Sequence, residues 1–178
     1  IWKNVDQEKT KSKFNILLEK CKPQPDEIEL LFTVMVKMAE NYPAPFTSTE
    51  IKKMKKLIKP FFDPKNNLTI SIFIKSLIDL QKGKLFETDQ LSEILKWITK
   101  HSENIDINFF NLIVLIFGKI NNIPNDGSPI PSIDLKGIEY LWNLLFTSKL
   151  PQVSAYFVNL IVRCQDSEAI NTFINRCL

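Results

Sequence analysis

Glycine is scarce in this sequence, which has four glycines among its 178 residues. Tight hairpin turns between β-strands need residues that adopt positive φ angles, and glycine does so at the lowest cost. Apolar residues, by contrast, make up 44% of the chain, which is enough for one substantial core. The composition therefore disfavours an all-β fold and predicts a single domain over residues 1–178.

Cysteine and histidine are also few. Cys21, Cys164 and Cys177 are odd in number and include no Cys-x-x-Cys pair, so they predict neither a disulfide framework nor a zinc site. We therefore expect three core thiols in a reducing, cytoplasmic compartment. A cysteine hydrolase needs a histidine beside its nucleophile and a residue that orients it. The single histidine, His101, lies at the expected end of a helix, where it can bind the last carbonyl groups, and we expect no catalytic residue.

The signatures of cofactor binding and of secretion are missing as well. No glycine-rich stretch of the type GxGxxG or GxxxxGK[ST] is present to hold phosphate groups, so we expect no cofactor. The chain starts at Ile1 without the charged and then apolar leader of a secreted protein. Residues 171–178 continue a helical pattern without a stop signal, and we therefore expect a fragment of a larger intracellular protein.

No apolar run is long enough to cross a membrane, which takes about 20 residues. The most apolar stretch, 107–120, is interrupted by Asn108, Asn111 and Lys119. A helix that is apolar on most sides usually lies at the centre of a bundle. The charge is nearly balanced, at 23 basic and 20 acidic residues, and alone it indicates neither a nucleic acid nor a membrane as partner.

The sequence is rich in helical periodicity. Apolar residues recur three and four positions apart along most of the chain, which predicts about nine helices with mostly short connections. Thr47 and Glu50 have the spacing of a capping box, Asp134 and Ser167 can cap the seventh and ninth helices, and Pro151 suits a first turn. The expected buried residues of the second, fourth and fifth helices are Ile28, Leu31, Phe32, Met35, Ala39, Ile70, Phe73, Ile74, Leu77, Ile78, Leu91, Ile94, Leu95 and Ile98.

The longest break in this pattern is the proline-rich segment 123–133. We expect it to be a connector that projects from the surface, between sub-units 1–122 and 134–178. Repeated helix–turn–helix units without strands are typical of armadillo and HEAT proteins. Because no strict sequence period is present, the predicted fold class is all-α, either an irregular armadillo-like or HEAT-like solenoid or a bundle of about nine helices.

The densest charged cluster lies on the third expected helix. It consists of Lys52, Lys53, Lys55, Lys56 and Lys59, which alternate with apolar residues at helical spacing. Such a face can bind phosphates, anionic lipid headgroups or an acidic protein surface, but it more often solvates the outer side of an amphipathic helix. No arginine accompanies these lysines, as nucleic-acid binding usually requires. We therefore favour a solvated face.

One stretch near the C-terminus is similar to a known family. Residues 137–142 (Gly-Ile-Glu-Tyr-Leu-Trp), followed by the apolar helix 155–162 and by 173–178 (Phe-Ile-Asn-Arg-Cys-Leu), resemble the armadillo-like region of the giant ubiquitin-specific proteases of the fat facets type. The resemblance implies that the parent is a cysteine deubiquitinase and that this chain belongs to its helical scaffold. The cysteine and histidine boxes of that family have no counterpart here, so no catalytic residue is carried over.

Two functions are compatible with these patterns. The favoured one is a non-catalytic scaffold or protein-interaction segment, because the helical pattern is accompanied by no site chemistry. The alternative is a module that binds an anionic surface, either a phosphoinositide membrane or a nucleic acid, through the lysines of 52–59. The sequence identifies neither the partner protein nor the face that binds it.

Overall fold

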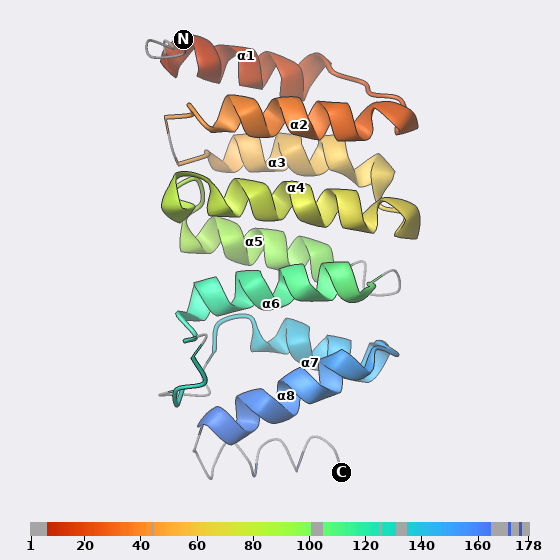
Figure 1. Ribbon diagram of the computed structural model, residues 1–178, viewed down its shortest axis with the longest axis vertical. Helices are drawn as coiled ribbons and strands as arrows, with labels where there is room; N and C mark the ends of the chain where they lie inside the picture. Colours follow the sequence, from red (N-terminus) through yellow and green to blue (C-terminus); the bar gives the residue numbers. More distant parts are fainter. Residues whose placement is uncertain are drawn as a thin grey trace. The chain divides into compact units, whose positions relative to one another are not determined.

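The computed structural model shows a helical protein. It describes residues 7–43, 45–100, 105–124, 126–130 and 135–164, together with Asn171 and Asn175. These residues contain eight α-helices and no β-strand (Figure 1), which confirms the predicted all-helical class. Of the ninth predicted helix only Asn171 and Asn175 are described, and both are helical; its expected cap, Ser167, lies outside the described residues.

The helices have the ordinary lengths of a globular protein. In chain order they are α1 (Gln7–Lys20), α2 (Ile28–Ala39), α3 (Ser48–Ile58), α4 (Asn67–Asp79), α5 (Thr88–Thr99), α6 (Ile107–Asn121), α7 (Ile138–Thr147) and α8 (Pro151–Cys164). Short 3-10 turns cover Pro25–Glu27, Lys59–Phe61, Pro64–Asn66 and Leu80–Gly83. Pro151 occupies the first position of α8, as the sequence predicts.

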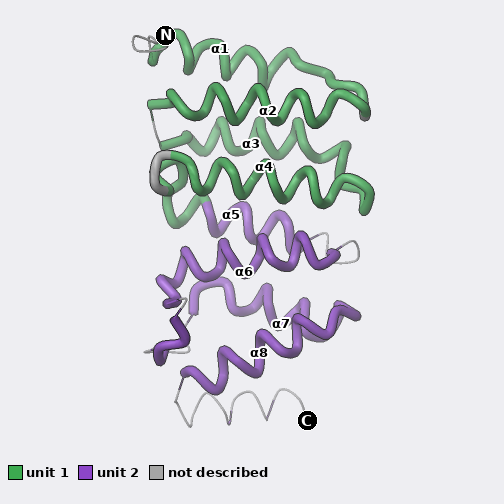
Figure 2. The backbone as a smooth tube through the Cα atoms, viewed as in Figure 1, with its two compact units in different colours: residues 1–90 green, residues 91–178 purple. Residues whose placement is uncertain are grey.

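The chain divides into two compact units, residues 1–90 and residues 91–178 (Figure 2). The boundary falls between Gln90 and Leu91, in the first turn of α5. The segment 123–133, expected to join two sub-units, falls within the sequence of unit 2.

The helices of unit 1 pack as two layers. α1 packs against α3, and α2 packs against α4, so that each helix contacts the next but one along the chain. Successive helices run in opposite directions (Figure 1), and α2 and α4 are therefore parallel. The predicted buried residues of α2, α4 and α5 are all buried, because each helix turns its apolar stripe toward the core.

Aromatic rings fill much of the core of unit 1. The ring centroid of Phe14 in α1 lies 5.2 Å from that of Tyr42 and 5.5 Å from that of Phe46. Phe32 of α2 stacks on Phe73 of α4, with centroids 4.1 Å apart. Aromatic pairs at such distances add about 0.5–1.5 kcal/mol to the effect of burying their area. The α2–α4 contact is therefore anchored by a ring pair.

In unit 2, α6 contributes more buried residues than any other described helix. Seven residues of α6 are buried: Phe109, Phe110, Leu112, Ile113, Ile116, Phe117 and Ile120. Phe110 meets the ring edge of Tyr156 in α8, and Trp142 of α7 packs on Phe157, with centroids 4.9 Å apart. Burial raises the pKa of Tyr156 to about 12. None of the described helices combines the length and apolar character that crossing a bilayer requires.

The proline-rich segment does not simply project from the surface. Arg163 in the last turn of α8 donates hydrogen bonds from Nε and Nη2 to the Ser128 carbonyl, at 3.0 and 2.9 Å, and from Nη2 to the Pro124 carbonyl at 2.6 Å. The Ile130 N–H donates to the Arg163 carbonyl at 2.9 Å, and the Ile130 side chain is buried. The expectation of a projecting loop is wrong because this arginine ties the segment to α8.

The start of α7 also differs from the prediction. α7 begins at Ile138, and its N-cap is Gly137, with φ +85°. Asp134, the expected cap, lies outside the described residues. A Cβ atom at Gly137 would lie 3.1 Å from Leu95 Cδ2 of α5, so both the backbone conformation and the close approach require glycine.

Candidate functional site

A buried glutamate joins α1, the α2–α3 turn and α3. Glu50 is 3% exposed; its Oε1 accepts hydrogen bonds from the Tyr42 hydroxyl and from Asn15 Nδ2 at 3.1 Å. Its Oε2 accepts from the Thr47 N–H and hydroxyl at 2.7 and 2.9 Å. Because protein donors engage both oxygens, Glu50 serves the fold and is a poor candidate for acid–base chemistry.

The electrostatics of this cluster follow from its donors. Burial acts to raise the pKa of Glu50, but hydrogen bonds from Tyr42, Thr47 and Asn15 stabilise the ionised form, and the net result is a lowered pKa. Burial, together with the bond to the carboxylate, raises the pKa of Tyr42. The predicted capping box of Thr47 and Glu50 is confirmed. Sequence analysis missed Tyr42 and Asn15, since no spacing rule relates Asn15 to Glu50.

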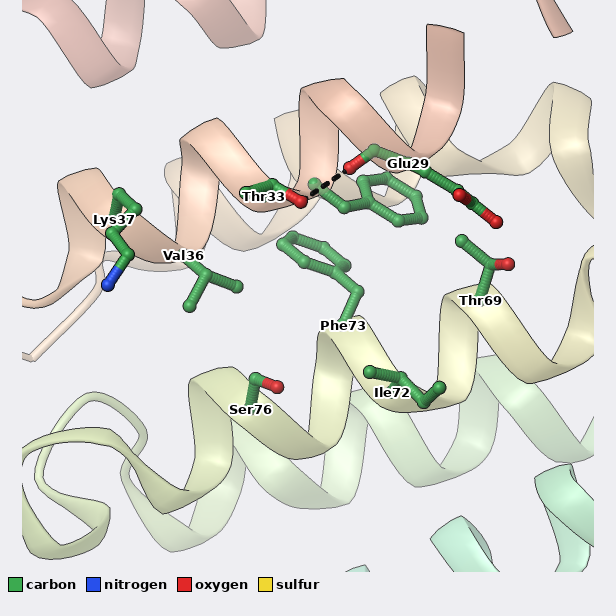
Figure 3. A pocket seen from close by; sticks show the side chains of 9 residues that line it. Glu29, Thr33, Val36, Lys37, Thr69, Ile72, Phe73 and Ser76 are labelled. Carbon is green, nitrogen blue, oxygen red and sulfur yellow. Dashed lines mark hydrogen bonds between the residues drawn. The ribbon is translucent and has the colours of Figure 1, made fainter. Parts of the chain in front are cut away.

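The first candidate binding surface is an apolar groove between α2 and α4, with a volume of about 400 Å³ (Figure 3). We call it the α2/α4 groove. Phe32 and Phe73 form its centre, and Val36 and Ile72 line it on either side. The Ile72 side chain is 56% exposed, although an isoleucine is usually found inside a protein. The groove therefore presents aliphatic carbon to solvent, above a floor formed by the buried ring pair.

The two ends of the α2/α4 groove carry opposite charges. Glu29 lies with Thr69 at one end, and Lys37 lies with Ser76 at the other (Figure 3). Thr33 donates its hydroxyl hydrogen to the Glu29 carbonyl at 2.8 Å, which leaves its methyl group for contacts with a ligand. Lys37 forms an exposed ion pair with Glu40 at 2.7 Å, which is screened by water.

The second candidate surface is a cavity of about 470 Å³ between the end of α1 and α3. We call it the α1/α3 cavity. Its residues from α1 and the following turn are Leu18, Glu19, Cys21, Lys22 and Pro23, and those from α3 and the turn after it are Lys53, Lys56, Leu57, Pro60 and Phe61. Apolar carbon and positive charge are thus combined in one hollow.

Only some lysines of the predicted cluster line this cavity. Lys53 and Lys56 line it, and Lys53 forms an ion pair with Glu19 at 2.5 Å, which lowers the pKa of that exposed carboxyl. Lys52 and Lys59 are exposed but do not line the cavity, and Lys55 is half-buried. A third lysine of the cavity, Lys22, was missed because it lies in the segment after α1, 34 residues before Lys56 in the sequence.

The described residues show no arrangement suited to holding a metal ion. No group of three or more His, Cys, Asp or Glu side chains among them is arranged to hold a metal ion. Cys164 is buried, as expected of a core thiol, whereas Cys21 is half-buried and lines the α1/α3 cavity. His101 and Cys177 lie outside the described residues.

Together these features describe an all-helical protein whose unit 1 carries an apolar groove and a basic cavity. Comparison with known proteins gives no match to a family model, to a curated protein or to a solved structure. Function is therefore inferred from the geometry of these surfaces.

Proposed function

We propose that this chain is a non-catalytic helical scaffold, and that its α2/α4 groove receives an amphipathic helix of a partner protein. The observation that carries the proposal is the solvent-open apolar lining of that groove, with Ile72 56% exposed beside the Phe32–Phe73 pair. Covering apolar surface contributes about 25 cal/mol per Å², so a complementary apolar face would bind here.

The dimensions of the groove favour a helix as the occupant. Glu29 and Lys37 are eight residues apart on α2, which corresponds to about 12 Å, or a little over two helical turns. Aliphatic residues at positions i, i+3 or i+4, and i+7 of a docked helix cover that length, as in other helix-in-groove complexes. A basic residue of the bound helix near Glu29 would fix its direction, because the positive charge at the other end, Lys37, is already paired with Glu40.

The packing of unit 1 supports a repeat-like architecture as part of this proposal. Contacts between each helix and the next but one are typical of armadillo and HEAT solenoids, which present extended binding surfaces. The scaffold of a giant ubiquitin-specific protease remains the proposed parent, through residues 137–142. The proposed parent is supported by the sequence resemblance alone, and the binding of a helix in the α2/α4 groove does not depend on it.

The experiment is a selection of displayed three-turn helical peptides against the purified chain. We expect the enriched peptides to carry an aliphatic stripe at i, i+3 or i+4, and i+7. Their affinity should fall at least tenfold for Ile72→Asp, about 1.4 kcal/mol. Val158→Asp is the matched control, since Val158 has the same 56% exposure on α8 and lies outside the groove. No enrichment, or equal losses for both variants, would overturn the proposal.

The alternative function, binding to an anionic membrane or nucleic acid, keeps one specific observation in its favour. Lys52 and Lys56 of α3 and Lys59 of the following 3-10 turn are exposed. Binding of this kind depends on charge density and weakens steeply with salt. If it operates, charge reversal at Lys52 and Lys59 should weaken binding to anionic vesicles or RNA as strongly as reversal at any other pair of lysines on this face.

A further inference from the structure

The α1/α3 cavity has an uncompensated positive charge. Three of its lining residues are lysines and one is a glutamate, and that glutamate, Glu19, is already paired with Lys53. Within the described residues no ion pair is formed by Lys22 or Lys56. These two ammonium groups come from different elements of unit 1 and border the same hollow. A ligand with two negative charges would be complementary to them.

The same cavity has an apolar lining. Leu18, Leu57 and Phe61 are buried in unit 1, at 6%, 8% and 7% exposure, and supply its hydrocarbon surface. Pro23 and Pro60 border it from the two connecting segments. Because proline restricts the backbone, these borders lose less conformational freedom when a ligand binds than ordinary loop residues would.

We propose that the α1/α3 cavity is a second recognition site, which takes an acidic peptide segment with one large apolar side chain. The apolar side chain lies against Leu57 and Phe61, and carboxylates on either side of it pair with Lys22 and Lys56. The volume of about 470 Å³ lies in the range of small ligand pockets, about 300–1,000 Å³. This site is separate from the α2/α4 groove, so either proposal can fail alone.

The lining favours a peptide over the other anionic partners. Nucleic acids are usually bound by stacking bases on exposed aromatic rings or on arginine, but no arginine lines this cavity and Phe61 is 7% exposed. An anionic bilayer responds to the number of lysines near its surface, so it would engage Lys52 and Lys59 as well as the lysines of the cavity. A peptide bound in the cavity would depend on Lys22 and Lys56 alone, whereas a bilayer would depend on all the exposed lysines of this face. Variants of the two pairs of lysines therefore distinguish a peptide from a bilayer.

The experiment compares two charge reversals of equal size. The probes are fluorescein-labelled peptides with a central phenylalanine or leucine between pairs of glutamates, and their anisotropy is measured with the purified chain. We expect the double variant Lys22→Glu, Lys56→Glu to weaken binding at least tenfold and Lys52→Glu, Lys59→Glu to change it less than threefold. All four lysines are exposed, so both double variants should fold, and circular dichroism of each variant checks this before binding is measured. Peptides with serine in the central position should bind at least tenfold more weakly.

The alkylation rate of Cys21 gives a second measure of binding in the cavity. Cys21 lines it, and peptide binding should slow alkylation of Cys21 by iodoacetamide several-fold, measured by mass spectrometry of its tryptic peptide. Buried Cys164 is the internal control and should not respond. The proposal is overturned if none of the probes binds, if both charge reversals weaken binding equally, or if vesicles containing phosphatidylserine bind while the peptides do not.

Discussion

The Tyr42 hydroxyl donates a hydrogen bond to Glu50 Oε1, and this bond ties the α2–α3 turn to the first turn of α3. Asn15 of α1 donates to the same oxygen at 3.1 Å. One buried carboxylate thus connects α1, the α2–α3 turn and α3. The stability of the unit should therefore be sensitive to this side chain.

Replacing Glu50 by alanine should destabilise the protein by about 2–4 kcal/mol, because it leaves the buried donors of Tyr42, Asn15 and Thr47 without their acceptor. Urea unfolding followed by circular dichroism measures the change. Glu40→Ala is the control, since Glu40 is exposed and takes part in a surface ion pair, and it should cost less than about 0.5 kcal/mol. Equal losses for the two variants would contradict the role assigned to Glu50.

The contribution of Glu50 should also depend on pH. The folded protein lowers the pKa of this carboxyl below its ordinary value of 4.5, so folding favours the ionised form. Its stabilisation is fully present above that value and is lost as the pH falls through the lower, folded pKa. The difference in unfolding free energy between the protein and Glu50→Gln should therefore be largest near neutral pH and shrink toward pH 3. A difference that grows on acidification would contradict the assigned direction.

Replacing Arg163 by alanine should loosen the attachment of segment 126–130 to α8, since the arginine side chain provides the bonds to the Ser128 and Pro124 carbonyls, while the bond from the Ile130 N–H to the carbonyl of residue 163 remains. We expect faster hydrogen exchange of this segment, and a loss of stability of about 1.5–3 kcal/mol, typical of charged hydrogen bonds. Hydrogen-exchange mass spectrometry resolves the segment from the rest of the chain. Lys149→Ala, at an exposed position, should leave its exchange unchanged.

Two glycines should respond to alanine with opposite signs. Gly137→Ala should destabilise by about 1–2 kcal/mol, because φ is +85° and the new Cβ would lie 3.1 Å from Leu95 Cδ2. Gly118→Ala, inside α6 with no atom within 4 Å of the new Cβ, should stabilise by about 0.5–1 kcal/mol. Thermal unfolding of both variants checks the pair. Stabilisation by Gly137→Ala would show that Gly137 does not have the conformation described.

Local patterns in the sequence predicted much of this fold. Five apolar residues of α2 recur at helical spacing, and all five are buried, since periodicity alone determines which face of a helix turns inward. The capping box of Thr47 and Glu50 was likewise predicted, because both partners lie within one turn.

Features that depend on distant residues were not predicted. Arg163 binds a carbonyl 35 residues earlier in the chain, and Asn15 binds Glu50, which is 35 residues later. The α2/α4 groove depends on how far apart two helices lie. The α1/α3 cavity depends on two segments of the chain bringing Lys22 and Lys56 to the border of one hollow. The lysines of α3 were visible in the sequence, but their division into those that line a cavity and those that do not was not.

The next-but-one packing of unit 1 has a mechanical consequence. Because α1 rests on α3 and α2 on α4, a force applied to the ends of the unit would peel helices away in turn, without shearing one long interface. Each released helix yields length: the twelve residues of α2 would extend from about 18 Å to about 40 Å. Under increasing force such a unit should lengthen in several small steps. An optical trap would record a gradual rise in extension and no single unfolding event.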